Sequence, residues 1–326
     1  MPLIFLTGGS GYLGHAITTY AQSKNYTIHS LSRSPSSDAK ILSLGAIPIR
    51  GDLTTLSVLR EQSQRADIVI HLADPMAGNY SLPYEERIRI DDEAVTAIAE
   101  GLAGTNKPLV VTSGSLVVAP TGKETDEEST LWEEGKALNE RIVSERRNLR
   151  LWGEMGVRVI VVRLPPFVYG RGGSGVGLFM GMFWNDVHGD GDGDGKKREV
   201  KVVREAEGVV TSAVHVEDAA ELYLLAAERA GAGEVFNGCS EWGVTFGELG
   251  RAMADVLGVE VGLVEFEEAA RVWGEFFARF WSTENRASGG KAMRELGWVP
   301  KKIGIVEEVR YGSYVGVAEK LRNGAA

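Results

Sequence analysis

Short apolar runs alternate with amphipathic stretches through the first half of the chain. The apolar runs predict strands at 3–6, 26–31, 46–49, 67–71, 109–112 and 157–163. The stretches between them have helical spacing and predict helices that open at Tyr12 and cover 39–44, 57–64, 84–102 and 133–154. Apolar strands separated by amphipathic helices are typical of a parallel sheet covered on both faces. The predicted fold class is α/β, with a doubly wound parallel sheet.

The pattern changes after Pro165-Pro166, where a glycine-rich loop at 170–177 leads into an apolar stretch rich in aromatic residues. A helix at 217–230 and a strand at 234–236 are expected to return to the sheet. We therefore expect two lobes with the substrate held between them. Their predicted extents are 1–170 plus about 211–240 for the sheet domain, and about 171–210 plus 241–326 for a smaller, discontinuous C-terminal substrate lobe.

A glycine-rich turn follows the first strand and opens the first helix. Gly8 permits a tight turn, Gly11 lets the backbone approach a pyrophosphate, and Gly14 lets the helix pack closely on the strand. The helix N-terminus adds free N–H donors and a positive dipole. This arrangement predicts a dinucleotide-binding Rossmann fold. The expected cofactor contacts in this turn are Gly8, Ser10, Gly11, Tyr12, Leu13 and Gly14.

The end of the second predicted strand reads Ser32-Arg33-Ser34, nineteen residues after Gly14. An NAD enzyme usually carries Asp or Glu here to bind the ribose hydroxyls, whereas an arginine with neighbouring hydroxyls suits a 2′-phosphate. The residues therefore favour NADP(H) over NAD(H). The alternative is that Arg33 is a solvated loop residue.

Composition narrows the range of partners. The chain has 326 residues, a formal net charge of -10 and a single cysteine, Cys239. We therefore expect no nucleic-acid or membrane partner, no disulfide framework and a small-molecule substrate. The first strand begins at Leu3 and no apolar run is long enough to span a bilayer, which predicts a cytoplasmic location. A homodimer is left open.

The TGxxGxxG spacing of residues 7–14 resembles the extended and atypical short-chain dehydrogenase/reductase superfamily. The stretches VRLPPFVYG at 162–170, VHVEDAA at 214–220 and LGWVP at 296–300 look like its NAD-dependent epimerase/dehydratase-like members, so the resemblance runs from end to end. It implies an NAD(P)-dependent enzyme. The resemblance also implies adenine and ribose wall positions, and the further expected cofactor contacts are Asp52, Leu53, Leu72, Ala73 and Pro165. Asp52 is equally expected to cap the next helix.

The chain departs from that family at the reacting centre. In the family a Tyr protonates the carbonyl oxygen, a Lys four residues later holds the nicotinamide ribose, and a Ser orients the substrate. Lys136 stands at the Lys position, but Trp132 replaces the Tyr, and an indole has no proton to give at neutral pH. Gly114 stands at the Ser position, with Ser113 and Ser115 on either side. The chain thus resembles a subgroup that lacks the usual Tyr.

The remaining candidates lie at the carboxyl edge of the sheet. Ser113 or Ser115 is expected to polarise a carbonyl and Lys136 to fix the nicotinamide ribose. Tyr169 is a candidate proton donor, and Tyr80 and Tyr84 lie on the same edge as expected wall residues.

These residues predict an NADP(H)-dependent oxidoreductase that reduces a carbonyl or conjugated double bond of a medium-sized, partly apolar metabolite. Two alternatives stay open. One is an epimerase, dehydratase or isomerase using the same site, and the other is an NADP-sensing protein without catalysis.

Three further patterns are interpreted as architecture. The aspartate–glycine repeat at 189–195 matches only half of a calcium loop and is expected to be an exposed hairpin tip, so no metal is predicted. His215 and Asp218 are expected to serve the fold, with Asp218 bonding near its helix start. Aromatic residues at 273–281 have helical spacing and are expected to form core, with one face available to a substrate pocket.

Overall fold

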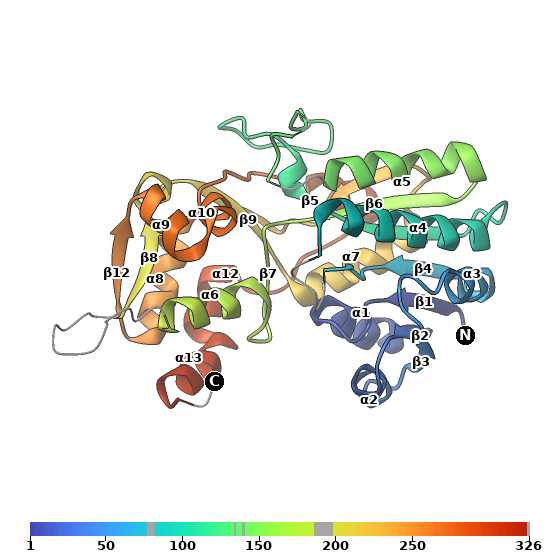
Figure 1. Cartoon of the computed structure of the whole chain (residues 1–326), viewed down its shortest axis with the longest axis horizontal. Coiled ribbons are helices and arrows are strands. Elements are labelled where there is room, and N and C mark those ends of the chain that lie inside the picture. The colour runs from blue at the N-terminus through green and yellow to red at the C-terminus, as the bar shows by residue number, and fades with distance from the viewer. Residues whose placement is uncertain (77–81, 134, 139–140, 186–197, 325–326) are drawn as a thin grey trace.

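The computed structural model describes residues 1–76, 82–133, 135–138, 141–185 and 198–324 of the chain (Figure 1). Its centre is a parallel sheet of seven strands in the order β10-β6-β5-β4-β1-β2-β3. The strands are β1 (Leu3–Thr7), β2 (Thr27–Ser32), β3 (Ile47–Arg50), β4 (Ile68–His71), β5 (Pro108–Gly114), β6 (Arg158–Leu164) and β10 (Glu234–Asn237). The order reverses between β1 and β4, which is where Rossmann folds bind a dinucleotide. The predicted fold class is confirmed.

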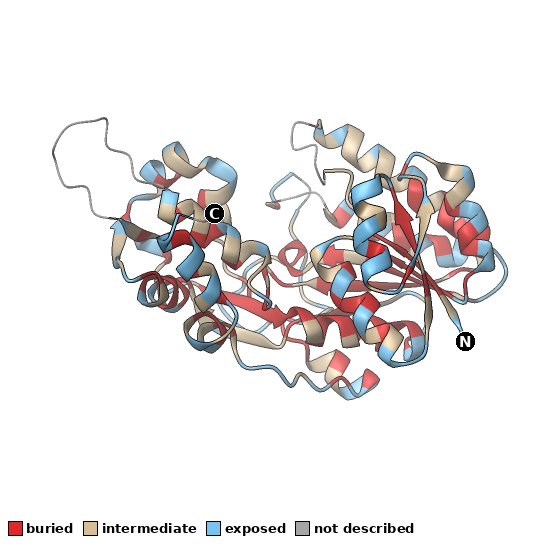
Figure 2. Ribbon diagram, turned by 90° about the horizontal axis from the view of Figure 1, so that it is seen from below, coloured by how far each residue is buried: buried red, intermediate tan, exposed pale blue. Residues whose placement is uncertain are grey.

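Helices cover both faces of this sheet because successive strand residues turn to opposite sides. One face packs on α1 (Tyr12–Ser23), α2 (Pro35–Ser43) and α7 (Val216–Arg229). The other packs on α3 (Leu56–Arg65), α4 (Tyr84–Leu102) and α5 (Arg141–Met155). Figure 2 shows the buried residues gathered on the strands and on the helix faces turned toward them. The alternation read from the sequence therefore corresponds to two separate apolar layers.

The second lobe lies beside this core along the long axis of the molecule (Figure 1). Its strands form a three-stranded sheet of β7 (Phe167–Tyr169), β9 (Val210–His215) and β11 (Glu241–Thr245), and a parallel pair of β8 (Glu199–Val203) and β12 (Glu260–Val264). Its helices are α6 (Ser174–Asn185), α8 (Phe246–Leu257), α9 (Phe266–Trp273), α10 (Glu275–Phe280), α12 (Ile305–Tyr311) and α13 (Tyr314–Arg322). α11 (Gly290–Leu296) packs instead on β10 and α7.

One predicted element is shorter in the structure. The helix expected at 133–154 begins at Arg141, and residues 135–138 form turns and bends. Gly135 has a φ of +80°, a left-handed conformation that a right-handed helix cannot contain. Trp132 and Lys136 therefore do not share a helix face.

Within the described residues, the helices are too short or too polar to cross a bilayer.

Candidate cofactor and substrate site

The glycine turn between β1 and α1 is built by close backbone contacts. Gly8 has a φ of +77°, and a Cβ there would lie 3.0 Å from the Ala73 backbone nitrogen. A Cβ on Gly14 would lie 2.2 Å from the Gly8 carbonyl oxygen. Side chains are excluded at both positions because rigid backbone atoms fill the space. The turn consequently brings Ala73, at the end of β4, directly against Gly8.

Gly11 differs from its two neighbours in the motif. A Cβ on Gly11 would approach one described atom outside its own chain neighbours, the Gly8 carbonyl oxygen at 3.2 Å. Gly11 is exposed, caps α1 without a side-chain bond, and is followed by a first turn that contains no acidic residue. Ser10 and Leu13 beside it are half-buried. The N–H groups of this helix end are therefore open to an anion.

Tyr12 connects the turn to the rest of the molecule. Its hydroxyl donates to the Gly170 carbonyl oxygen at 2.6 Å, and the Gly170 N–H donates to the Tyr314 hydroxyl at 3.0 Å. Burial, reinforced by the neighbouring Tyr314, raises the pKa of Tyr12 above its ordinary value. Tyr12 thus remains a neutral hydrogen-bond donor.

The end of β2 carries a local positive charge. Arg33 is exposed, and within the described residues no carboxylate pairs with it. Arg50, from the end of β3, donates to the Ser32 carbonyl oxygen at 3.2 Å and pairs with Asp38 in the first turn of α2. The Ser32 hydroxyl also donates to Asp38. The Asp38 carboxylate is therefore already occupied, and among the described residues Arg33 remains without an acidic partner.

The residues after β3 form a compact turn. Asp52 Oδ1 accepts from the Thr54 N–H at 2.9 Å, from the Thr54 hydroxyl at 2.7 Å and from the Thr55 hydroxyl at 3.1 Å. The Thr54 hydroxyl bond is the main cause that lowers the pKa of Asp52, although partial burial opposes it. Asp52 is exposed and lies upstream of α3, whose N-cap is Thr55, while Leu53 is buried. Asp52 therefore shapes the turn before the helix and is not its N-cap.

A hydrogen-bond chain fixes the end of β4. The Thr7 hydroxyl oxygen accepts from the backbone N–H groups of Leu72 at 3.1 Å and Ala73 at 3.2 Å. Its own proton is then directed to His71 Nδ1, 2.9 Å away. That bond assigns the proton of the ring to Nε2, which donates to Asp91 Oδ1 at 3.1 Å. Leu72 and Ala73 are thereby held beside the glycine turn.

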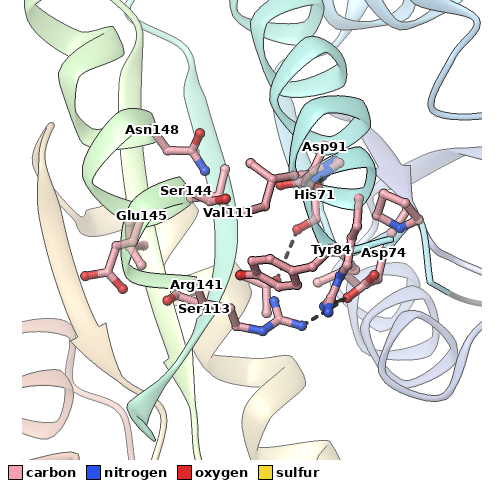
Figure 3. Close-up of a pocket in the computed structure, with 17 residues that line it drawn as sticks. His71, Asp74, Tyr84, Asp91, Val111, Ser113, Arg141, Ser144, Glu145 and Asn148 are labelled. Carbon is pink, nitrogen blue, oxygen red and sulfur yellow. Dashed lines mark hydrogen bonds and ion pairs between the residues drawn. The ribbon is translucent and has the colours of Figure 1, made fainter. Parts of the chain in front are cut away.

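A polar cavity opens between α4 and α5 above β4 and β5 (Figure 3). It contains about 780 Å³ of empty space, part of which is open to solvent. Because Leu72 and Ala73 line it, the cavity adjoins the glycine turn. Its polar lining residues are His71, Asp74, Tyr84, Arg87, Asp91, Thr112, Ser113, Arg141, Ser144, Glu145 and Asn148.

Asp74 joins the two helices that border the cavity. Its Oδ2 accepts from Arg87 Nη2 on α4 and from Arg141 Nη2 on α5, the latter at 3.0 Å, while its Oδ1 accepts from the Met76 N–H at 2.9 Å. Burial alone would raise the pKa of this carboxyl, but the guanidinium groups of Arg141 and Arg87 outweigh it and hold the pKa below its usual range. An ionised carboxylate shared between two cations therefore lines the cavity.

Two polar side chains of the cavity wall have unused hydrogen-bonding capacity. Ser113 and Asn148 are each 5% exposed, and among the described residues neither Ser113 Oγ nor Asn148 Oδ1 has a partner. Glu145 is instead fully engaged, because Arg163 holds it in a buried bidentate ion pair at 2.6–3.2 Å. Buried polar atoms without partners are costly, so a bound polar group would satisfy them.

The four residues predicted to act in catalysis do not meet at one place. Ser113 lines the cavity, but Ser115 is fully buried and donates to Asn285 Oδ1 of the C-terminal segment at 2.9 Å. Lys136 is exposed and pairs with Glu133 at 2.5 Å. Tyr169 is 1% exposed, and its hydroxyl lies 2.8 Å from both Glu241 Oε1 and the Ile303 carbonyl oxygen.

Burial and the Glu241 carboxylate raise the pKa of Tyr169 well above its usual range. Pro165, an expected cofactor contact, is buried directly after β6. Trp132 is half-buried, and its indole nitrogen has no partner among the described residues. Of the predicted catalytic residues, the structure places Ser113 in the cavity beside the glycine turn.

Several residues that line the cavity were not predicted from the sequence. Asp74, Arg87, Arg141 and Asn148 come from three separate segments, and nothing in their local spacing marks them. Asp74 could have been predicted from its position, since it directly follows Leu72 and Ala73, which were expected to line the cofactor site.

Two structural expectations are corrected or confirmed outside the cavity. Asp218 does not bond near its own helix start but accepts from the N–H groups of Lys301 at 3.0 Å and Lys302 at 3.1 Å. The long loop before α12 needs the Asp218 carboxylate as an acceptor, because the backbone of the loop has no strand partner there. His215 serves the fold by capping α7, where it accepts from the Glu217 N–H. Of the aromatic residues at 273–281, Trp273, Phe277, Phe280 and Trp281 pack into the core of the second lobe, as predicted, whereas Phe276 is 52% exposed. The repeat at 189–195, like Tyr80, lies outside the described residues.

Comparisons with known proteins agree with this geometry. An uncharacterized protein of Saccharomyces cerevisiae is 31% identical over 309 residues, which is 94% of this chain and 97% of the relative. A 4-hydroxy-2-methyl-3-oxo-4-farnesyl-3,4-dihydroquinoline-1-oxide ketoreductase of Stigmatella aurantiaca is 27% identical over 242 residues, 71% of this chain and 66% of the relative. The structure of UDP-glucose 4-epimerase from Thermotoga maritima superposes with a TM-score of 0.73 at 18% identity, covering 99% of this chain and 100% of the epimerase.

Residues 4–239 match the model of one protein family. This range contains the glycine turn, nearly all of the seven-stranded sheet and the residues that line the cavity. The chain belongs to the NAD dependent epimerase/dehydratase family, and is an NAD(P)-dependent enzyme of the Rossmann type.

Proposed function

We propose that the protein is an NADP(H)-dependent oxidoreductase that reduces a carbonyl, or a conjugated double bond, of a medium-sized and partly apolar metabolite. The observation that carries the proposal is the position of the cavity. It adjoins the glycine turn through Ala73 and contains the buried Ser113 hydroxyl, which has no partner among the described residues. A carbonyl oxygen of a substrate would accept this hydroxyl's proton in a hydrogen bond.

The charges at the end of β2 support NADP(H) over NAD(H). Arg33 is exposed there, and Arg50 together with Ser32 occupies the nearby Asp38 carboxylate. A free carboxylate would bind ribose hydroxyls and repel a 2′-phosphate, whereas an uncompensated guanidinium attracts that phosphate. The glycine turn fits the pyrophosphate because Gly11 is open and the N-terminus of α1 is uncapped. The bound cofactor supplies or takes up a hydride.

The likeness to a ketoreductase of Stigmatella aurantiaca also favours reduction. The alternative with specific support is a redox-neutral reaction in the same site, since the family includes epimerases and dehydratases. The two functions differ in one measurable respect. A redox-neutral enzyme consumes no NADPH over the whole reaction, whereas a reductase oxidises it.

Titration of NADPH and NADH against the wild type and Arg33→Ala tests the cofactor. NADPH is expected to bind the wild type about tenfold to a hundredfold more tightly, since a charge-assisted contact contributes about 1.5–3 kcal/mol. Arg33→Ala should remove most of that preference. Arg65→Ala is the matched control, because Arg65 is equally exposed but lies at the end of α3 and pairs with Glu61.

Equal affinities of the wild type for the two cofactors would end the NADP(H) assignment. A panel of ketones and enones, followed by NADPH oxidation, tests the reaction itself. Turnover of at least one compound is expected, whereas tight NADPH binding without any NADPH oxidation across the panel would favour the redox-neutral alternative.

A further inference from the structure

The cavity contains a tyrosine to which the family resemblance assigns no role. Tyr84 is the first residue of α4, and it lines the cavity together with Ser113, near the end of β5, and Arg141, the first residue of α5. Figure 3 shows the Tyr84 ring extending from α4 toward the side of the cavity that Ser113 and Arg141 occupy. Three separate elements thus present a phenol, a hydroxyl and a guanidinium to one space.

We propose that Tyr84 donates the proton to the carbonyl oxygen of the substrate, taking the role for which Trp132 is chemically unfit. The inference rests on the proposed reductase function and names the proton donor of the same site. Ser113 is the second hydrogen-bond donor to that oxygen. Arg87 and Arg141 are the cations that stabilise the phenolate left on Tyr84.

His71, the other residue in the cavity that commonly acts as an acid, has no free ring nitrogen. Its Nδ1 lies 2.9 Å from the Thr7 hydroxyl, and its Nε2 lies 3.1 Å from Asp91 Oδ1. Both bonds serve the end of β4, because the Thr7 oxygen also holds the backbone N–H groups there. A reaction that used the His71 proton would break the hydrogen bonds that join Thr7, His71 and Asp91.

Three other tyrosines do not line the cavity, and their hydroxyl groups hold other parts of the fold together. The hydroxyl of Tyr169 lies against Glu241 and that of Tyr12 donates to Gly170. The hydroxyl of Tyr223 lies 2.7 Å from that of Thr112. Burial raises the pKa of each of these three phenols. Tyr84 is half-buried, and among the described tyrosines it is the one that lines the cavity.

The charges around Tyr84 fit a neutral substrate group. The Arg87 guanidinium carbon lies 6.0 Å from the Tyr84 ring centroid, and Arg141 lines the same wall. Cations at such distances favour a phenolate over a phenol. The charged lining residues are Arg87, Arg141, Asp74, Asp91 and Glu145, and their formal charges cancel once Arg163, paired with Glu145, is counted. A neutral carbonyl group therefore enters without leaving an uncompensated charge, whereas a carboxylate does not.

The step balances without a further reactant. As a hydride reaches the carbonyl carbon, the π electrons of the C=O bond move to the oxygen. That oxygen takes the proton of the Tyr84 hydroxyl, so the O–H bond of the phenol breaks and the O–H bond of the product alcohol forms. Water then returns a proton to the Tyr84 phenolate through the open side of the cavity.

Tyr84→Phe tests the proposal because it deletes the hydroxyl and retains the ring beside Arg87. With a carbonyl compound that the wild type reduces, the single-turnover rate is expected to fall by about a hundredfold or more, the usual loss for a general acid. NADPH affinity should stay within about threefold, since the hydroxyl is not assigned to cofactor binding. Tyr311→Phe, at a tyrosine that is 77% exposed, is the matched control and should behave as the wild type.

Ser113→Ala provides a second variant that should fold, because Ser113 Oγ has no partner to lose among the described residues, and its turnover should fall about tenfold.

The outcomes separate this inference from the function on which it rests. Tyr84→Phe that turns over at the wild-type rate overturns the assignment of Tyr84. Wild-type turnover in Ser113→Ala shows that the carbonyl does not bind in this cavity. A wild type that binds no NADPH overturns the proposed function instead.

Discussion

The Tyr12 hydroxyl donates to the Gly170 carbonyl oxygen across 158 residues of sequence, at 2.6 Å. Tyr12 is the first residue of α1, and Gly170 follows β7 at the entry to the second lobe. The Gly170 N–H continues the connection to the Tyr314 hydroxyl, at the start of α13. The helix that would hold the pyrophosphate is therefore linked through Gly170 to the C-terminal part of the chain.

Tyr12→Phe is expected to lower the free energy of unfolding by about 1–3 kcal/mol, because the carbonyl of buried Gly170 loses its donor. Urea denaturation measures the change. Tyr26→Phe is the control, since its hydroxyl bonds Glu228 at an exposed position and its loss should cost less than about 0.5 kcal/mol. Equal costs for the two variants would show that the Tyr12 bond is no stronger than a surface bond.

Gly11→Val should abolish dinucleotide binding and leave the protein folded. The added Cβ would meet the Gly8 carbonyl oxygen at 3.2 Å, and the branch projects where the pyrophosphate approaches. Thermal melting with and without NADPH shows both effects, as a normal transition that the ligand no longer shifts. Gly14→Val is the contrasting variant and should unfold the protein, because its Cβ would lie 2.2 Å from backbone oxygen. A ligand-induced shift that persists in Gly11→Val would remove Gly11 from the contact.

Lys136→Ala is expected to change turnover and NADPH affinity by less than about threefold. The sequence predicted that Lys136 fixes the nicotinamide ribose, yet its ammonium group is exposed and pairs with Glu133 in a turn. Such a surface ion pair contributes little. Single-turnover rates and cofactor titrations provide the measurement. A loss of about a hundredfold would mean that residues 132–138 wind into the helix when the cofactor binds and carry Lys136 to the ribose.

Asp74 should make the free energy of unfolding depend on pH. The folded pKa of Asp74 lies below its unfolded value of about 3.9, because two guanidinium groups favour the carboxylate. Its contribution is therefore complete above the unfolded pKa and disappears as the pH falls through the lowered folded pKa. Urea denaturation between about pH 7 and 3 should show the gap between the wild type and Asp74→Asn closing toward low pH. A gap of constant size would disprove this linkage.

The layered core follows from local patterns in the sequence. Apolar strands and amphipathic helices have periods of 2 and 3.6, which are visible in any short window, and they predicted the sheet of β1 to β6 together with its two helical layers. The glycine turn could also be predicted from the sequence. Gly14 is required by a contact with the Gly8 carbonyl oxygen inside the same turn, and that contact depends on spacing alone.

The helix before Arg141 shows where local patterns mislead. Residues 133–140 are mostly polar, like those of α5, and the family resemblance favoured a helix that contains both Trp132 and Lys136. Gly135 adopts a left-handed conformation that ends any such continuation, and this choice depends on the surrounding contacts. For that reason Trp132 and Lys136 do not lie on one helix face, although the resemblance had implied that they would.

The cavity could be found only in three dimensions. Asp74, Arg87 and Arg141 lie on different elements, and their convergence depends on how α4 and α5 pack over β4 and β5. Local periodicity establishes which residues turn toward the sheet, but it carries no information on which side chains of two helices meet across their gap. Packing therefore decided which serine faces the cavity, since Ser113 and Ser115 lie two residues apart and the chain leaves its strand at Gly114, between them.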